Sequence, residues 1–234
     1  MEKIGLDIRT KKSLLAYLME FVSDHKKCLF EEIIEHRTEH LTVVLEDIYQ
    51  PQNASAVLRS CDCFGIQNVH IIENTNQYRI SSGVTLGADK WLTKHYYNKE
   101  KNNTLACINS LKKQGYQIVA TTPHEQDCSI EDLDLSQKTA LIFGNEHKGI
   151  SDIAIKHADN FAKIPMYGFS ESLNISVSAA ICLFHLSQKM KMELESWGLE
   201  ERTRVDVLLN WARSTVKKVD LIERDFMEKS VSNQ

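Results

Sequence analysis

Three clusters of polar side chains interrupt the apolar pattern of this sequence, and each follows a run that reads as a strand. Asn53 and Arg59 lie in "PQNASAVLR", Glu146 lies in "LIFGNEHKGIS", and Ser172 and Asn174 lie in "IPMYGFSESLNISVSAAICLF". Open parallel sheets bind ligands at the carboxyl ends of their strands, where a carboxylate such as Glu146 would stand. The three clusters therefore indicate a ligand site at one edge of a sheet.

Each cluster also has a purely structural explanation. Asn53 could cap a helix that leaves Arg59 on its accessible face, because Ala54, Val57 and Leu58 form the apolar stripe. Glu146 could be a solvated turn residue. Ser172 and Asn174 are ordinary residue types for the start of a helix. No single cluster decides between the two explanations, and their joint occurrence carries more weight.

The sequence does not contain the usual phosphate-binding loops. It has no GxGxxG after its first strand and no GxxxxGK[ST], so a dinucleotide enzyme and a P-loop NTPase both lose their main support. A ligand with little or no phosphate fits better.

Hydrophobic periodicity predicts the elements that must position these residues. Residues 10–37 read as a helical hairpin, and a very apolar helix runs from about residue 173 to about residue 190. Strands are predicted at "LTVVLEDI", "NVHII", "WLTKHYY", "YQIVATT", "KTALIFG" and "NFAKIP", with helices between them, one of which ends at Gly115. This alternation predicts an α/β fold with a mostly parallel sheet and helices on both faces.

Composition bounds the class of protein. The chain has 234 residues, 42% hydrophobic and 26% charged, which is typical of a folded protein. No apolar run reaches membrane-spanning length and no signal peptide is evident, so we expect a cytoplasmic location, no membrane association and reduced cysteines. Cys61 and Cys63 form an isolated CxC, which predicts buried thiols and no metal site. The net charge of −4 does not indicate a nucleic-acid-binding protein, although local basic segments exist, one of them around Arg37.

The three clusters together resemble motifs 1, 2 and 3 of the SpoU/TrmH class of SPOUT methyltransferases. "NASAVLRSCDCFGIQNVHII", "LIFGNEHKGIS" and "IPMYGFSESLNISVSAAICLF" occur in the family's order and at its separations, and "SSGVTLGADKWL" is also similar to that class. The resemblance spans roughly residues 36–190.

The resemblance implies a fold and an assembly that periodicity could not show. The family has a parallel α/β sheet whose C-terminal part forms a deep trefoil knot, an exception to the rule of unknotted chains. It implies a SPOUT methyltransferase domain at 39–192, with helical extensions at 1–38 and 193–234, and a homodimer with residues of both chains near one site.

The resemblance also implies the cofactor S-adenosylmethionine, bound largely by backbone groups of the loops after three strands. By motif match these groups belong to Thr121, Gly144, Ile164, Met166 and Leu173. Capture by backbone groups would explain why a phosphate-binding glycine signature is missing.

The implied reaction is methyl transfer to a ribose 2′-OH of RNA. The resemblance places Arg59 near the attacking hydroxyl, Asn53 and Glu146 as neighbours that position it, and Ser172 and Asn174 as supports of the substrate and the methionine end. Because a guanidinium has a pKa above about 12, removing its proton is costly. We therefore expect Arg59 to stabilise the developing alkoxide and to bind an adjacent phosphate.

Helical segments at both ends resemble the branch of the family that methylates a D-loop guanosine of tRNA, at position 18 in tRNA numbering. Arg37 would then contact the RNA, together with Arg59. Three alternatives stay open: a ribosomal RNA 2′-O-methyltransferase, a catalytically silent knotted RNA-binding protein, and a small-molecule-binding α/β protein.

Overall fold

The computed structural model describes residues 6–122 and 128–232, which fall into two compact units. Residues 38–197 form the sheet unit, and the chain up to residue 37 joins the chain from residue 198 onward in the terminal unit. The two ends of the chain, which the sequence predicts as separate extensions, thus lie in one unit. Each unit has its own hydrophobic core.

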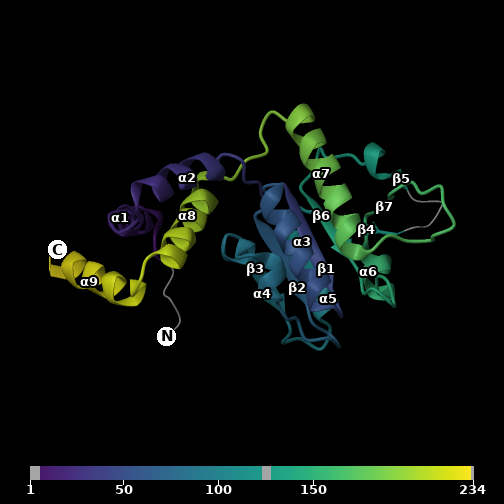
Figure 1. The fold of residues 1–234 in the computed structure, drawn as a ribbon, viewed down its shortest axis with the longest axis horizontal. Coiled ribbons are helices and arrows are strands. Elements are labelled where there is room, and N and C mark those ends of the chain that lie inside the picture. Colours follow the sequence, from purple (N-terminus) through teal and green to yellow (C-terminus); the bar gives the residue numbers. More distant parts are fainter. Residues whose placement is uncertain (1–5, 123–127, 233–234) are drawn as a thin grey trace. The chain divides into compact units, whose positions relative to one another are not determined.

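The sheet unit is built on seven strands in the order β3-β2-β1-β6-β4-β7-β5 (Figure 1). All pairs of neighbouring strands run parallel. The strands are β1 (Leu41–Glu46), β2 (Asn68–Ile72), β3 (Thr93–Tyr97), β4 (Gln117–Thr121), β5 (Cys128–Ser129), β6 (Thr139–Phe143) and β7 (Asn160–Lys163). The predicted parallel α/β sheet is confirmed.

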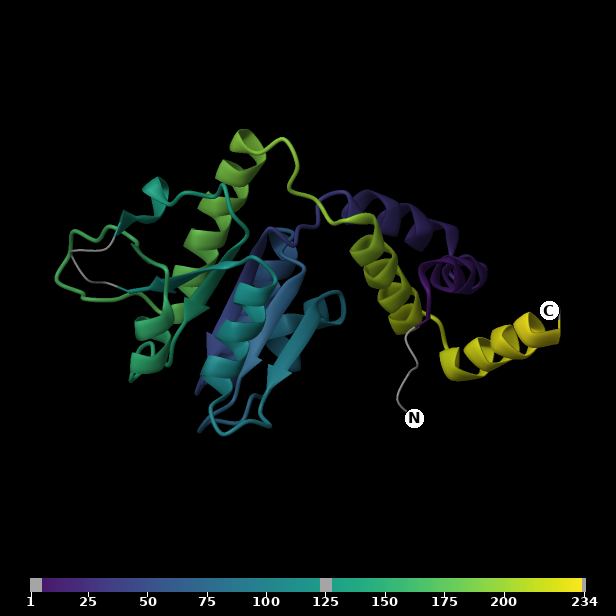
Figure 2. The same ribbon diagram turned by 180° about the vertical axis from the view of Figure 1, so that it is seen from behind.

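Helices cover both faces of this sheet, which explains why all six residues of β1 are buried. On one face lie α3 (Pro51–Cys63) and α7 (Ile175–Glu193), and their apolar side chains share a core with Val43 and Leu45 (Figure 1). On the other face lie α5 (Asn103–Lys113) and α6 (Asp152–His157), which pack in a second core with Val44 (Figure 2). Short helical turns are α4 (Ser82–Thr85), η1 (Ala88–Lys90) and η2 (Ile130–Asp132).

The terminal unit contains only helices within the described residues. They are α1 (Ile8–Met19), α2 (Asp24–Ile34), α8 (Glu201–Thr215) and α9 (Val219–Ser232). Leu14 and Leu18 pack with Leu209 and Ala212 in its core, and Lys11 forms an ion pair with Asp206. The predicted hairpin of residues 10–37 is confirmed as α1 and α2.

Two features of the described residues bear on the expectations from composition. None of the described helices combines the length and the apolar character needed to cross a membrane. Cys61 is buried as predicted, whereas Cys63 is exposed. The prediction for Cys63 was wrong because it lies at the end of α3, two residues beyond Cys61 and therefore on another side of the helix.

Candidate active site

A cavity of about 790 Å³ opens at the carboxyl edge of the sheet. Loops after β4, β6 and β7 and the start of α7 form it, so it lies where a parallel sheet is expected to bind a ligand. Nine of the residues singled out from the sequence line it: Asn53, Thr121, Gly144, Glu146, Ile164, Met166, Ser172, Leu173 and Asn174.

Glu146 joins this cavity to the helix that carries Asn53 and Arg59. Its carboxylate accepts hydrogen bonds from the backbone N–H groups of Tyr49 (2.9 Å) and Gln50 (3.1 Å) and from the side-chain amide of Asn53 (2.8 Å). The N-cap residue of α3, Gln50, makes no side-chain cap of its own. Glu146 therefore binds the backbone N–H groups just before α3 in place of a local cap, and its negative charge stands at the positive end of the helix dipole.

These contacts also set the protonation of Glu146. Partial burial alone would raise its pKa, but the hydrogen bonds from Asn53 and from the backbone of Tyr49 and Gln50 outweigh it and hold the pKa below its usual value. Glu146 is thus an ionised carboxylate whose oxygens already serve three donors. Such a group positions its neighbours and is a poor proton acceptor.

Asn53 extends this network from motif 2 to motif 3. Its side-chain oxygen accepts from the amide of Asn174 at 3.1 Å, while the oxygen of Asn174 accepts from the backbone N–H of Ser176 at 2.8 Å and so caps α7. A continuous chain of hydrogen bonds, here called the motif bridge, thus runs Glu146–Asn53–Asn174 to the start of α7.

Two sequence-based cap assignments need correction. Asn53 does not cap α3, because that helix already begins at Pro51, a residue type favoured in the first turn. Ser172 lies outside α7 and does not cap it, since Asn174 does. Ser172 is exposed and lines the cavity.

Gly144 allows the cavity loop to double back on itself. A β-carbon at this position would lie 2.3 Å from the carbonyl carbon of Gly149 and 2.4 Å from the nitrogen of Ile150. Asn145 and Gly149 exchange two backbone hydrogen bonds, at 2.9 and 2.8 Å, which close this turn. The close approach of two backbone segments requires glycine here.

Arg59 does not meet the other predicted catalytic residues within one chain. It is exposed on α3 and is absent from the cavity lining. Asn53 lies six residues earlier, which places the two side chains on different sides of the helix. Within the described residues, no hydrogen bond or ion pair engages its guanidinium.

Arg37 lies in the terminal unit and not at a surface. Its side chain is only 2% exposed, and its guanidinium carbon stands 5.3 Å from the ring centre of Trp211. A buried guanidinium stacked on an aromatic ring is a packing element. This placement does not match the predicted contact of Arg37 with RNA.

Sequence reasoning missed several residues of the cavity. Gln50, whose side-chain oxygen accepts from Asn53 at 3.1 Å, lines it, as do Ser178 and the buried Cys182 of α7. Residues Ser178 and Cys182 looked like ordinary members of an apolar helix, and only their spacing of four and eight from Asn174 could have placed them on its side. No group of three or more potential metal ligands occurs among the described residues.

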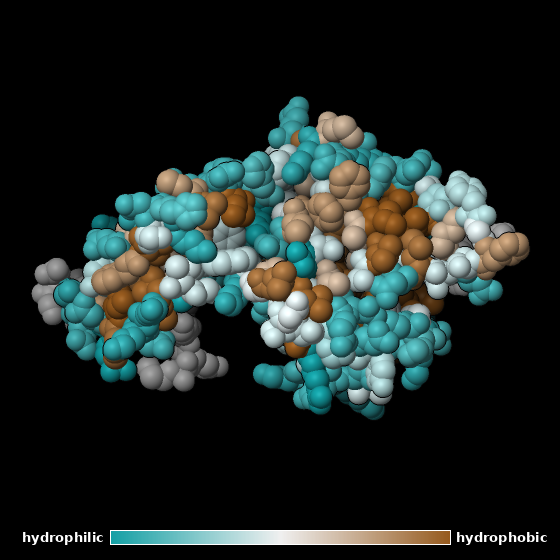
Figure 3. Space-filling model, in the orientation of Figure 1, coloured by the Kyte–Doolittle hydropathy of each residue, from teal (hydrophilic) through white to brown (hydrophobic). Residues whose placement is uncertain are grey.

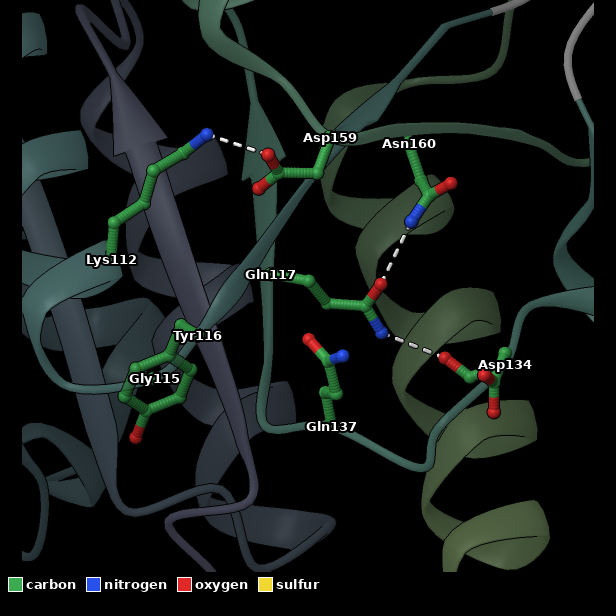
Figure 4. A pocket seen from close by; sticks show the side chains of 8 residues that line it. All are labelled: Lys112, Gly115, Tyr116, Gln117, Asp134, Gln137, Asp159 and Asn160. Carbon is green, nitrogen blue, oxygen red and sulfur yellow. Dashed lines mark hydrogen bonds and ion pairs between the residues drawn. The ribbon is translucent and has the colours of Figure 1, made fainter.

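A second cavity, of about 630 Å³, opens at the opposite edge of the sheet (Figure 4). Its polar side chains bind one another. Lys112 pairs with Asp159 at 2.6 Å, and Gln117 accepts from Asn160 at 2.8 Å while donating to the carbonyl of Asp134 at 2.7 Å. The cavity at the carboxyl edge is the better candidate for a ligand, because parallel sheets bind ligands at the carboxyl ends of their strands.

The family model described as the SpoU rRNA Methylase family matches residues 40–184. The chain belongs to this family. The matched range contains the whole motif bridge and the cavity lining. The protein is accordingly a methyltransferase that uses S-adenosylmethionine, in agreement with the resemblance of its three motifs.

Similar proteins place the chain within the family. It is 39% identical over 209 residues to a tRNA (guanosine(18)-2′-O)-methyltransferase of Borreliella burgdorferi, covering 89% of this chain and 94% of the relative. A protein of the same name from Thermus thermophilus is 34% identical, covering 78% of this chain and 93% of the relative. A third, from Escherichia coli, is 30% identical, covering 68% and 67%.

Solved structures agree with the fold. The Aquifex aeolicus TrmH/SpoU tRNA modifying enzyme has a TM-score of 0.74 at 27% identity, covering 83% of this chain and 98% of that one. The SpoU methyltransferase AviRb of Streptomyces viridochromogenes, in complex with AdoMet, has a TM-score of 0.58 at 24% identity and covers 69% and 64%. The second likeness concerns the fold alone.

Proposed function

We propose that this methyltransferase transfers a methyl group from S-adenosylmethionine to the ribose 2′-hydroxyl of guanosine 18 in the D-loop of tRNA, in the cytoplasm. The names of the relatives support this substrate. The observation that carries the proposal is the motif bridge, because it ties all three motifs to one cavity.

The residues at the cavity fit the cofactor. The volume suits a nucleoside-sized molecule, and apolar side chains of Ile164 and Leu173 stand beside backbone groups of Thr121 and Gly144. These residues and Met166 would hold S-adenosylmethionine, which supplies an already activated methyl group. The protein therefore has to orient the ribose hydroxyl and manage one proton.

The described side chains divide this work. Glu146 and Asn53 hold the start of α3 and the start of α7 in register, since their polar atoms are occupied by each other and by the backbone. Ser172 offers its hydroxyl to a ligand in the cavity. Arg59 stabilises negative charge on the attacking oxygen and binds a phosphate beside it, which its permanent charge suits and general-base chemistry does not.

Arg59 reaches the site from a second copy of the chain in this proposal. One chain alone leaves it outside the cavity lining, so the site is incomplete without a partner. On α7, the side chains of Val177, Ile181 and Phe184 leave an exposed apolar stripe, which Leu173 continues just before the helix, and Phe184 is 57% exposed. Apolar side chains gather over the face that carries α7 (Figure 3), and such a patch suits a homodimer interface.

Mixing two inactive variants tests this arrangement. The Arg59→Ala chain keeps its cavity but lacks the arginine. The Ile164→Glu chain keeps Arg59 but has a charge at an apolar position of its cavity. If each site combines one chain's cavity with the partner's Arg59, mixed dimers regain activity. If the cavity and Arg59 act within one chain, both sites of a mixed dimer are inactive. In that case Phe184→Asp, which places a charge in the apolar stripe of α7, would lower activity only by destabilising the fold.

The trefoil knot of the family is part of the proposal. The likeness to the Aquifex aeolicus enzyme supports it, because that structure superposes over most of this chain. Pulling the unfolded chain by its two ends tests it. A knotted chain stops short of its full contour length, whereas an unknotted one extends completely.

The decisive assay follows labelled methyl from S-adenosylmethionine into tRNA and ribosomal RNA, with nucleoside analysis. We expect 2′-O-methylguanosine in tRNA, no label with Arg59→Ala, and none in a tRNA carrying 2′-deoxyguanosine at position 18. Label found only in ribosomal RNA would mean that the substrate is ribosomal RNA and not tRNA. Cofactor binding without transfer to either RNA would indicate a silent RNA-binding protein.

A further inference from the structure

The segment between β2 and α4, residues 74–81, presents polar side chains and one arginine to solvent. Asn74, Thr75, Gln77 and Arg79 are exposed. Within the part of the chain that the structure describes, no hydrogen bond, ion pair or ring contact engages the guanidinium of Arg79. Neither the family match nor the three motifs assigns this segment a role.

Asp47 holds the segment in one conformation. Its carboxylate oxygen Oδ1 accepts hydrogen bonds from three consecutive backbone N–H groups, those of Asn74 (2.7 Å), Thr75 (2.8 Å) and Asn76 (3.2 Å). The backbone of Asp47 is in the left-handed region, at φ 52°, which a short acidic side chain tolerates. A loop fixed in this way loses little conformational freedom when it binds a partner.

The same residue places the segment beside the cavity. The carbonyl oxygen of Asp47 accepts from the side-chain amides of Asn76 (2.8 Å) and Asn145 (2.7 Å). Asn145 lines the cavity. Two groups that share one acceptor atom must be close neighbours, so Asn76 lies next to Asn145 at the rim of this chain's own cavity.

A second contact joins the segment to the helix of Arg59. The backbone N–H of Ser81 donates to the hydroxyl of Ser55 at 2.8 Å. Ser55 and Arg59 are four residues apart on α3, and residues at that spacing lie one turn apart on the same side of a helix. Ser81 is therefore held against the side of α3 that carries Ser55 and Arg59, and Arg79 lies two residues before Ser81 in the chain.

Two carboxylates that contact the segment, Asp47 and Glu73, form no ion pair with Arg59 or Arg79 within the described residues. Asp47 is engaged by three backbone N–H groups. Glu73 accepts from the backbone N–H of Tyr78 and from the side-chain amide of Asn98, both at 2.6 Å. The acidic side chains next to the segment thus face backbone and amide donors, while both guanidinium groups face solvent.

We propose that residues 74–81 are a binding site for the phosphate backbone of the substrate RNA, in which Arg79 binds a phosphate next to the one bound by Arg59 of the same chain. The proposal rests on the RNA methyltransferase function. A chain of net charge −4 needs local cations to hold RNA, and arginine binds phosphate through two parallel hydrogen bonds. The anchored segment supplies such a cation at the edge of the site.

The salt dependence of tRNA binding tests the assignment. Arg79→Ala should weaken binding about three- to thirtyfold at moderate salt, and should reduce the slope of log K against log [salt] by about 0.7 to 0.9, the value for one lost phosphate contact. Arg79→Lys should keep the slope, because it keeps the charge. Binding of S-adenosylmethionine should not change in either variant, which shows that the cavity is intact.

Lys113→Ala is the matched control. Lys113 is an exposed cation in the last turn of α5, at the opposite edge of the sheet, so its loss changes net charge equally without touching the segment. An unchanged slope in Arg79→Ala, or an equal change in Lys113→Ala, would overturn the proposal. If wild type binds no tRNA at any salt concentration, the proposed function fails first.

Discussion

At the scale of single residues, polar side chains that look catalytic are largely occupied in holding the site together. Glu146 serves three donors and Asn53 serves both Glu146 and Asn174. Little of their hydrogen-bonding capacity is left for a substrate. In the proposed function, the chemistry therefore depends on Ser172, which lines the cavity, and on the exposed Arg59.

Replacing Glu146 by glutamine tests this division. Glutamine keeps an oxygen but adds an NH₂ group and removes the charge, so the N–H groups at the start of α3 lose a charge-assisted partner. We expect a loss of about 1–2 kcal/mol in the free energy of unfolding, as for a lost helix cap. Urea unfolding measures it.

The same variant separates positioning from proton transfer. If Glu146 were a general base, Glu146→Gln would abolish turnover at every pH, whereas a positioning role should leave measurable turnover once the variant is folded and saturated with both substrates. Glu100→Gln is the control, because Glu100 is exposed in the same unit and its carboxylate forms no hydrogen bond or ion pair with a described residue. It should leave both stability and turnover as in wild type.

At the scale of elements, the short link between β1 and α3 is the organising feature. Within four residues it supplies Asp47, which holds the segment 74–81 and Asn145, and the N–H groups of Tyr49 and Gln50, which bind Glu146. The turn after β6 and the segment after β2 are thus fixed to the same link.

Three substitutions of Asp47 separate its backbone from its side chain. Asp47→Gly permits the left-handed conformation but removes the carboxylate. Asp47→Ala also removes the carboxylate and in addition disfavours the left-handed conformation, which should lower the free energy of unfolding by about 1 kcal/mol more. Asp47→Asn keeps an oxygen acceptor and tolerates this conformation, so it should be the mildest. Urea unfolding ranks the three variants.

Hydrogen exchange locates the effect. The amides of Asn74, Thr75 and Asn76 should exchange faster in Asp47→Gly than in wild type, because their common acceptor is gone. Equal exchange rates in the two proteins would mean that the carboxylate does not hold the segment. The amides of β4 lie elsewhere in the sheet and serve as the internal reference.

At the scale of the whole molecule, stability should depend on two neighbouring histidines in the sheet. His70 of β2 and His95 of β3 face each other in register, with ring centres 4.6 Å apart and planes 15° apart. Burial, together with the charge of His95, lowers the pKa of His70 to about 3, and burial lowers the pKa of His95. Both rings are therefore neutral in the folded chain at pH 7.

The sign of the pH effect follows. Between the ordinary histidine pKa of about 6.5 and the lowered values, the unfolded chain binds protons that the folded chain does not. The free energy of unfolding should fall as pH falls below about 6.5, by up to about 1.4 kcal/mol per pH unit for each histidine. Urea unfolding between about pH 7 and pH 5 measures the slope.

His70→Phe should make this slope shallower, since it removes one of the two buried titrating groups. His25→Asn is the control, because His25 is exposed. A slope that is the same in wild type and His70→Phe would show that this pair does not govern the acid sensitivity of the protein.

The sequence allowed the sheet, its parallel character and the cavity to be predicted, because β-branched runs and polar motifs are local patterns. It could not show partners from distant parts of the chain. The start of α3 at Pro51 depends on Glu146, which lies after β6, and the burial of Arg37 depends on Trp211 of α8. Arg37 sits among charged neighbours, so its own surroundings in the sequence indicate a solvated surface.

The turn at Gly144 has a consequence for how this gene can vary. A codon for any other amino acid at this position would put a β-carbon 2.3 Å from backbone atoms of Gly149, which cannot rotate away as a side chain could. Gly83, in contrast, has no atom within 4 Å of such a carbon. In a saturation library selected for enzyme activity, position 144 should stay glycine, while position 83 accepts alanine.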